Sequence, residues 1–139
     1  MTILDTNVVS EIMRPLPSRA VLRWMSTQPP DRLHVTSITI AEVMYGIELL
    51  PSGKRQEALR MGAEKLFQVV FADRILGFDA RAAREFSMIA SSRRRRGRPI
   101  SELDAQIAAI TRFHGGALAT RDIGDFEGCG IELINPWRE

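Results

Sequence analysis

The stretch Thr2-Ile3-Leu4-Asp5-Thr6-Asn7-Val8-Val9 decides the fold, because a short apolar run ends abruptly at three polar residues. Residues 2–4 are predicted to form a buried strand, and residues 8–14 a short helix that ends before Pro15. A strand that passes directly into a helix is typical of α/β proteins. Asp5 therefore stands at the carboxyl end of the first predicted strand.

The rest of the chain alternates in the same way. Short apolar runs predict further strands, and segments with helical periodicity separate them. The predicted strands cover residues 2–4, 33–36, 75–78, 117–120 and 131–134, and the predicted helices cover residues 8–14, 18–26, 40–50, 54–67, 80–95 and 101–113. Residues 68–72 fit neither pattern. This alternation predicts an α/β fold, namely a three-layer α/β/α sandwich around a central parallel sheet of about five strands.

The composition is typical of a soluble globular protein, and residues 1–139 are expected to form a single domain. No apolar run approaches the roughly 20 residues that span a bilayer, which argues against a membrane protein. The amino terminus has an acid at position 5 and no basic region, so a signal peptide is not expected. The single cysteine, Cys129, suits a reducing compartment. These features predict a cytoplasmic protein.

The positive charge is concentrated in one stretch. The whole chain carries a net charge of +2, so without five clustered arginines the remainder would carry −3. The cluster consists of Arg93, Arg94, Arg95, Arg96 and Arg98. These cations are either solvated charges at a helix carboxyl terminus or contacts to the phosphates of a nucleic acid. Arg121 also has two interpretations. It is either a substrate contact or a surface partner of Asp122.

Four acids stand near predicted strand ends or strand-to-helix junctions: Asp5, Glu42, Asp104 and Asp122. In a parallel sheet the carboxyl ends of the strands lie along one edge, so acids far apart in sequence meet in space. Carboxylates crowded in one place repel one another, and a hard divalent cation is the simplest remedy. The pattern therefore predicts a metal-dependent enzyme that acts on phosphate esters.

Each acid also has an ordinary structural interpretation. Asp5 could cap the first helix, and Asp122 could belong to a turn. Glu42 follows Thr39 at the spacing of a capping box, and Asp104 follows Ser101 in the same way. Capping explains each acid singly, but it does not explain why all of them fall at the same edge of the predicted sheet.

Magnesium or manganese is the expected ion, because both favour oxygen ligands. His34 and His114 are far apart and Cys129 is single, which disfavours zinc. We expect Asp5 and Asp104 to hold the first ion.

Asp122 is expected to complete the site, and Glu42 to hold a second ion or orient the attacking water. Three neighbours are candidate hydrogen-bond partners of these carboxylates: Thr6, Asn7 and Thr120. The chain has no phosphate-binding loop and no glycine-rich dinucleotide fingerprint, so a nuclease is favoured.

In the order and spacing of these motifs, the chain resembles a PIN domain. More narrowly, it resembles the VapC-type toxins, and within those the FitB-like branch, whose chains end in Asn-Pro-Trp. The motifs are Asp5-Thr6-Asn7 after a strand, Ile40-Ala41-Glu42, Asp104 before Ile107-Ala108-Ala109, and Thr120-Arg121-Asp122. The resemblance implies a magnesium- or manganese-dependent endoribonuclease toxin of a type II toxin–antitoxin system. It also implies an RNA substrate, a homodimer, a cognate antitoxin laid across the acidic site, and contact with DNA only through that antitoxin.

Two points stay open at this stage. Many members of the family have Asn where Asp122 stands and an acid three residues later, and here Asp125 is acidic as well. Either residue could be the fourth acid. The alternative to an enzyme is a PIN-like binding module whose main task is to pair with a DNA-binding antitoxin in a repressor complex.

Overall fold

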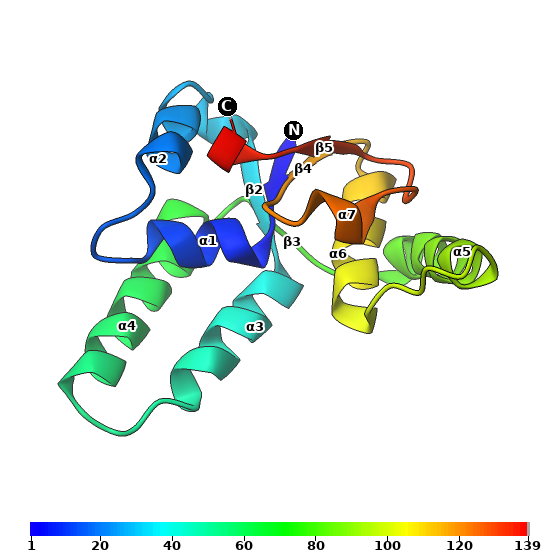
Figure 1. The fold of residues 1–139 in the computed structure, drawn as a ribbon. Coiled ribbons are helices and arrows are strands. Elements are labelled where there is room, and N and C mark those ends of the chain that lie inside the picture. The colour runs from blue at the N-terminus through cyan, green and yellow to red at the C-terminus, as the bar shows by residue number, and fades with distance from the viewer. Residues whose placement is uncertain (139) are drawn as a thin grey trace.

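The computed structural model describes residues 1–138 and contains one five-stranded sheet, in the order β3-β2-β1-β4-β5 (Figure 1). Every neighbouring pair of strands is parallel. The strands are β1 (Thr2–Leu4), β2 (Leu33–Thr36), β3 (Ile75–Leu76), β4 (Ala117–Ala119) and β5 (Glu132–Ile134). The predicted parallel α/β sandwich is therefore confirmed.

The helices connect the strands and flank the sheet. They are α1 (Thr6–Ile12), α2 (Arg19–Ser26), α3 (Ser37–Glu48), α4 (Lys54–Lys65), α5 (Ala80–Arg95), α6 (Glu102–Phe113) and α7 (Ile123–Phe126). Two 3-10 turns, η1 (Pro30–Arg32) and η3 (Pro136–Arg138), and a π-helical turn, η2 (Leu66–Val70), complete the described chain. Within residues 1–138, no helix is long and apolar enough to cross a membrane.

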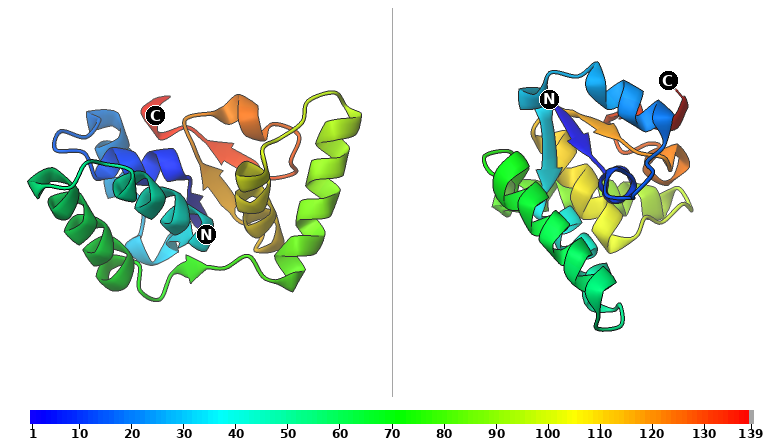
Figure 2. Two further views of the ribbon diagram at one scale, coloured as in Figure 1. Left: turned by 90° about the horizontal axis from the view of Figure 1, so that it is seen from below. Right: turned by 90° about the vertical axis from the view of Figure 1, so that its left-hand side faces the viewer.

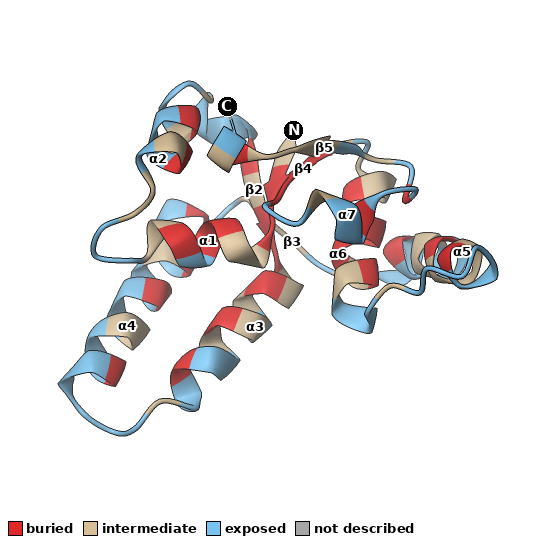
Figure 3. Ribbon diagram, in the orientation of Figure 1, coloured by how far each residue is buried: buried red, intermediate tan, exposed pale blue. Residues whose placement is uncertain are grey.

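The two faces of the sheet bury two separate clusters of side chains. Successive residues of a strand point to opposite faces, so Ile3 packs with α5 and α6 whereas Leu4 packs with α1 to α4. Leu118 and Ala119 of β4 divide in the same way. Figure 2 shows α4 and α5 on opposite sides of the molecule, and Figure 3 shows the buried strands between exposed outer helix surfaces. The helices cover the two faces of the sheet, and its carboxyl edge lies between these two layers.

Two serines cap helices where predicted helices begin, whereas Thr39 does not. Ser18 caps α2 by accepting a hydrogen bond from the N–H of Val21, and Ser101 caps α6 by accepting from Asp104. Thr39 does not cap a helix, because α3 begins earlier and its cap is Thr36. A capping box between Thr39 and Glu42 is therefore excluded, and the Glu42 side chain is available for other contacts.

Arg93 is buried and ties the end of α5 to the segment around α7. Its guanidinium donates hydrogen bonds to the carbonyl oxygens of Arg98 at 2.7 Å, Asp125 at 2.8 Å and Glu127 at 3.0 Å. Only 5% of the residue is exposed. This burial speaks against a contact between Arg93 and a nucleic acid, because its Nε and Nη1 groups already donate inside the protein. The other four arginines of the cluster are exposed.

Replacing Arg93 is expected to destabilise the fold. Arg93→Met keeps much of the side-chain volume but leaves the three carbonyl groups without their donor, so we expect the free energy of unfolding to fall by about 3 kcal/mol. The matched control is Arg94→Met at the neighbouring exposed position, which should change stability by less than about 0.5 kcal/mol. Urea unfolding measures both. Equal stabilities of the two variants would contradict the structural role of Arg93.

Candidate active site

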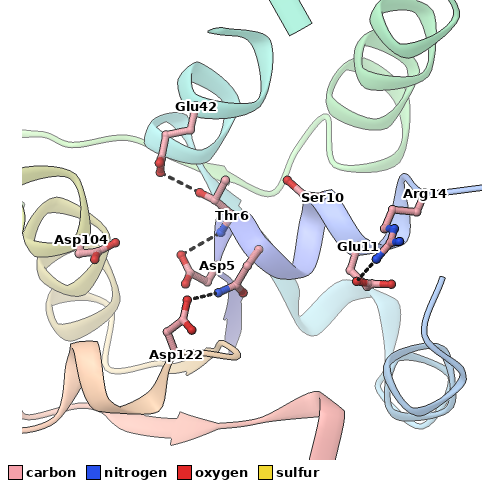
Figure 4. A pocket seen from close by; sticks show the side chains of 9 residues that line it. Asp5, Thr6, Ser10, Glu11, Arg14, Glu42, Asp104 and Asp122 are labelled. Atoms are coloured by element: carbon pink, nitrogen blue, oxygen red, sulfur yellow. Dashed lines mark hydrogen bonds and ion pairs between the residues drawn. The ribbon is translucent and has the colours of Figure 1, made fainter. Parts of the chain in front are cut away.

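A cleft of about 540 Å³ opens at the carboxyl edge of the sheet, and all four predicted acids line it (Figure 4). They come from four different places along the chain: the start of α1, the middle of α3, the first turn of α6 and the residue before α7. The nine lining residues are Asp5, Thr6, Asn7, Ser10, Glu11, Arg14, Glu42, Asp104 and Asp122.

Asp5 is placed by the sheet and by the first helix together. Its backbone N–H donates to the carbonyl oxygen of Ala119 at 2.9 Å, which continues the contact between β1 and β4. Its Oδ1 accepts from the N–H of Thr6 at 2.8 Å, and its Oδ2 accepts from the hydroxyl of Thr120 at 2.7 Å. Asp5 therefore caps α1, as the ordinary interpretation expected, and also faces the cleft.

Burial makes the negative charge of Asp5 costly. The residue is only 5% exposed, and this desolvation is the main reason why the pKa of its carboxyl rises from 3.8 to about 6. The hydrogen bonds from Thr120 and Thr6 lower the pKa, whereas the charges of Asp104 and Glu42 raise it further. A nearby positive charge would therefore stabilise the charged form of the Asp5 carboxyl.

Glu42 is held by a hydroxyl rather than by its own helix. The hydroxyl of Thr6 donates to Oε1 of Glu42 at 2.8 Å and lies 2.9 Å from the hydroxyl of Thr39. Thr39 is fully buried and contacts Thr36 at the start of α3. The first residue of α1 thus orients an acid of α3.

Asp122 is held by the beginning of α1 in a similar way. The side-chain amide of Asn7 donates to Oδ2 of Asp122 at 3.1 Å and to the hydroxyl of Thr120 at 3.3 Å. The same hydroxyl accepts from the N–H of Asp122 at 3.1 Å. Each of the three candidate hydrogen-bond partners therefore contacts at least one of the four acids, namely Thr6, Asn7 and Thr120.

Asp104 faces the other acids from the first turn of α6. Its pKa is raised, mainly by partial burial and further by the charges of Asp125, Glu42 and Asp122, while a hydrogen bond with Ser101 lowers it. Of the two candidates for the fourth acid, Asp122 lines the cleft, and Asp125 lies one turn away on α7 with its charge still felt by Asp104. Both acids therefore contribute to the negative potential at Asp104.

The donor set fits a hydrated oxygen-seeking cation. Within residues 1–138, no three acidic, histidine or cysteine side chains already converge on one point. The four acids instead stand around the cleft, where the charges of Asp104 and Glu42 act on Asp5. The charges of Glu42 and Asp122 act on Asp104. Magnesium commonly keeps several of its waters and uses one or two carboxylates, so it does not need a closed cage of side chains.

The predicted arginines lie outside the cleft. None of Arg93, Arg94, Arg95, Arg96, Arg98 or Arg121 is among its lining residues in the described chain. Arg96 and Arg98 donate to carbonyl groups of Gly128 and Gly124 beside α7, and the guanidinium of Arg121 lies over the ring of Trp137.

Three lining residues were not predicted from the sequence: Ser10, Glu11 and Arg14. The signal was present, because Asn7, Ser10 and Glu11 recur at intervals of three and four residues and thus share one face of α1. Arg14 follows three residues after Glu11, just beyond the end of the helix. That face is the one that continues from Asp5 into the cleft.

Comparisons with known proteins identify the family. The family model described as PIN domain matches residues 2–127. The plasmid stability protein StbB of Pseudomonas syringae is 42% identical over 99% of each chain, and the VapC ribonuclease Y4jK of Sinorhizobium fredii is 38% identical over 99% of this chain and 98% of its own. Toxin FitB of Neisseria gonorrhoeae is 36% identical over the full length of both chains.

Two solved structures are also closely similar. One, the structure of FitAB bound to an IR36 DNA fragment, has a TM-score of 0.92 at 36% identity and covers 99% of this chain and 96% of that chain. The other, FitAcB from Neisseria gonorrhoeae, has a TM-score of 0.90 at 37% identity over the whole of both chains. The chain therefore belongs to the PIN-domain family, in the branch that includes VapC ribonucleases and the FitB toxin.

Proposed function

We propose that the protein is a magnesium- or manganese-dependent endoribonuclease that cuts phosphodiester bonds of RNA. The observation that carries this proposal is the cleft in which Asp5, Glu42, Asp104 and Asp122 face one another. The one cation among its lining residues in the described chain, Arg14, lies at the far end. The ribonuclease name of the relative Y4jK supports RNA as the substrate.

The four acids have distinct proposed roles. Asp5 and Asp104 hold the ion, and Asp122 completes its site. When bound, the ion supplies positive charge that offsets the acids and stabilises the charge that develops on the phosphate oxygens. Glu42, fixed by the Thr6 hydroxyl, orients the attacking water and accepts its proton, or contributes to a second ion site.

The surrounding hydrogen bonds hold the acids in position, and at Asp5 they also favour the charged form. Thr120 donates to Asp5, and Asn7 donates to Asp122. The bond from Thr120 lowers the pKa of Asp5 against the effect of burial, and the bond from Asn7 orients the side chain of Asp122. Thr6, Asn7 and Thr120 are therefore positioning residues.

Removal of one ion-holding acid is expected to abolish cleavage. Purified wild-type protein with magnesium should cut total RNA into discrete fragments, whereas Asp104→Asn should be slower by about a hundredfold or more, since it loses charge stabilisation in the transition state. Excess EDTA should silence the wild type, and manganese should restore it. The control is Asp73→Asn, which removes an acid that is 90% exposed. Undiminished cleavage by Asp104→Asn would rule out its proposed role.

The metal-free protein should be stabilised when Asp5 loses its charge. A carboxyl whose pKa is about 6 when folded and 3.8 when unfolded holds its proton more tightly in the fold, so stability falls as the pH rises through this interval. In EDTA at about pH 8, Asp5→Asn should therefore raise the free energy of unfolding by up to about 3 kcal/mol. At about pH 3 the gain should vanish. Urea unfolding at both pH values tests this, and a variant less stable than wild type at pH 8 would refute it.

The protein is further proposed to be a toxin that a cognate antitoxin neutralises, and to form a homodimer. The FitB relative is named a toxin, and the solved FitAB structure is bound to a DNA fragment. A DNA-binding partner protein, rather than this chain, would then contact the operator DNA. Binding of that partner is the second candidate function, and it does not require intact acids.

Growth assays separate the enzyme from the binding module. Expression of the wild-type chain in a bacterial host is expected to arrest growth, and co-expression of the antitoxin encoded beside it should relieve the arrest. Asp5→Asn should abolish toxicity while the variant still co-purifies with the antitoxin, because the acid is needed for catalysis and not for the fold. Undiminished toxicity of Asp5→Asn would favour the binding module.

A further inference from the structure

The cleft carries more negative charge than one divalent ion can neutralise. Five of its nine lining residues are acidic, since Glu11 joins the four described above. One divalent ion does not balance this charge, and the phosphates of RNA add more. An RNA strand therefore requires a positively charged contact at the rim, and the arginines near α7 do not line the cleft.

Arg14 occupies that position. It is the one cation among the cleft-lining residues of the described chain, and Figure 4 shows it with Glu11 at the end of the cleft opposite Asp104. Arg14 follows the carboxyl end of α1, and Asp5 directly precedes its start, so the length of this helix separates the two residues. Arg14 is thus placed for a phosphate beside the reacting one, and not for the reacting phosphate itself.

Glu11 holds Arg14 at the rim through one nitrogen of the guanidinium, Nη1. Oε1 of Glu11 accepts from Nη1 of Arg14 at 3.4 Å, and Oε2 accepts from the N–H of Ser18 at 2.8 Å. The Glu11 side chain is 8% exposed, whereas that of Arg14 is 66% exposed. The acid is therefore anchored by the protein on its other side, and most of the guanidinium N–H groups face solvent.

A second groove of about 740 Å³ continues from this end of the cleft between α1, α3 and α4. Three residues line both the cleft and the groove: Ser10, Arg14 and Glu42. Arg14 therefore lies where the cleft and the groove meet. Arg55 lies further along the groove. The positive charge therefore continues away from the acids on this side of the molecule.

We propose that Arg14 binds a backbone phosphate of the RNA next to the bond that is cut, and so directs the strand from the acidic cleft toward the groove between α3 and α4. This inference rests on the proposed ribonuclease function. The contact is to phosphate, so it positions the strand without reading its sequence. Arginine suits this task, because its planar fork pairs with two phosphate oxygens at once.

RNA binding as a function of salt tests the assignment. The parent is Asp104→Asn, which does not consume the probe, and the probe is a short fluorescein-labelled oligouridine measured by anisotropy with magnesium present. Into this parent we place Arg14→Gln, Arg14→Lys and, as matched control, Arg23→Gln. Arg23 is an exposed residue of α2 outside the cleft, so the control loses the same unit of charge.

Arg14→Gln is expected to weaken binding roughly fivefold at low salt, and to lower the slope of log affinity against log salt by about 0.7, the value for one phosphate of a single strand. Arg14→Lys should retain most of the slope, and Arg23→Gln should match the parent. In the active protein, Arg14→Gln should raise KM for RNA with kcat little changed, because the lost contact is made equally in the ground and transition states.

A slope for Arg14→Gln equal to that of Arg23→Gln would overturn the assignment of Arg14 while leaving the ribonuclease intact, provided that wild type cleaves RNA. A reduced slope that coincides with a lowered urea midpoint and is not restored by Arg14→Lys would also overturn it, as a folding effect. If wild type neither cleaves nor binds RNA, the proposed function and this inference fail together.

Discussion

The site depends on the register between β1 and β4. Leu4 pairs with Ala119, and the N–H of Asp5 donates to the Ala119 carbonyl, so the two strands end together. Asp5 and Thr120 are consequently side by side although 115 positions separate them, and the Thr120 hydroxyl reaches the buried carboxylate. A shift of one residue would turn one of these side chains to the opposite face of the sheet. Two of the other acids are then fixed relative to Asp5 through α1, whose Thr6 and Asn7 hold Glu42 and Asp122.

The same arrangement makes the metal-free fold bear an electrostatic cost. Hydroxyl, amide and backbone N–H groups stabilise the acids, but they are dipoles and not charges. The raised pKa of Asp5 and that of Asp104 show that burial and mutual repulsion outweigh these dipoles. A divalent cation would relieve the repulsion at both positions, so a site built for an ion is destabilising without one. Stability elsewhere must compensate, as in the two apolar clusters and the buried Arg93.

Much of the fold could be predicted from the sequence, because apolar strands and helical periodicity are local signals. Helix α5 and strand β2 have the predicted bounds, and the convergence of the acids follows from strand ends meeting at one edge. Local signals fail where several neighbouring residues could each cap the same helix. They also fail where the hydrogen-bond partner of a side chain is distant in sequence. Thr36, Ser37 and Thr39 can all cap a helix, so the start of α3 was misplaced. Arg93 resembles its exposed neighbours in sequence, and only the distant carbonyl groups that it meets explain its burial.

The most direct test of the central claim is to locate the ion itself. Crystals of the protein grown with manganese and measured at the manganese absorption edge should give an anomalous difference peak in the cleft, in contact with carboxylate oxygens of Asp5 and Asp104. The same peak should be absent from Asp104→Asn crystals treated identically. A well-ordered cleft without a peak, or a peak bound only outside it, would contradict the claim that these distant acids share one divalent ion.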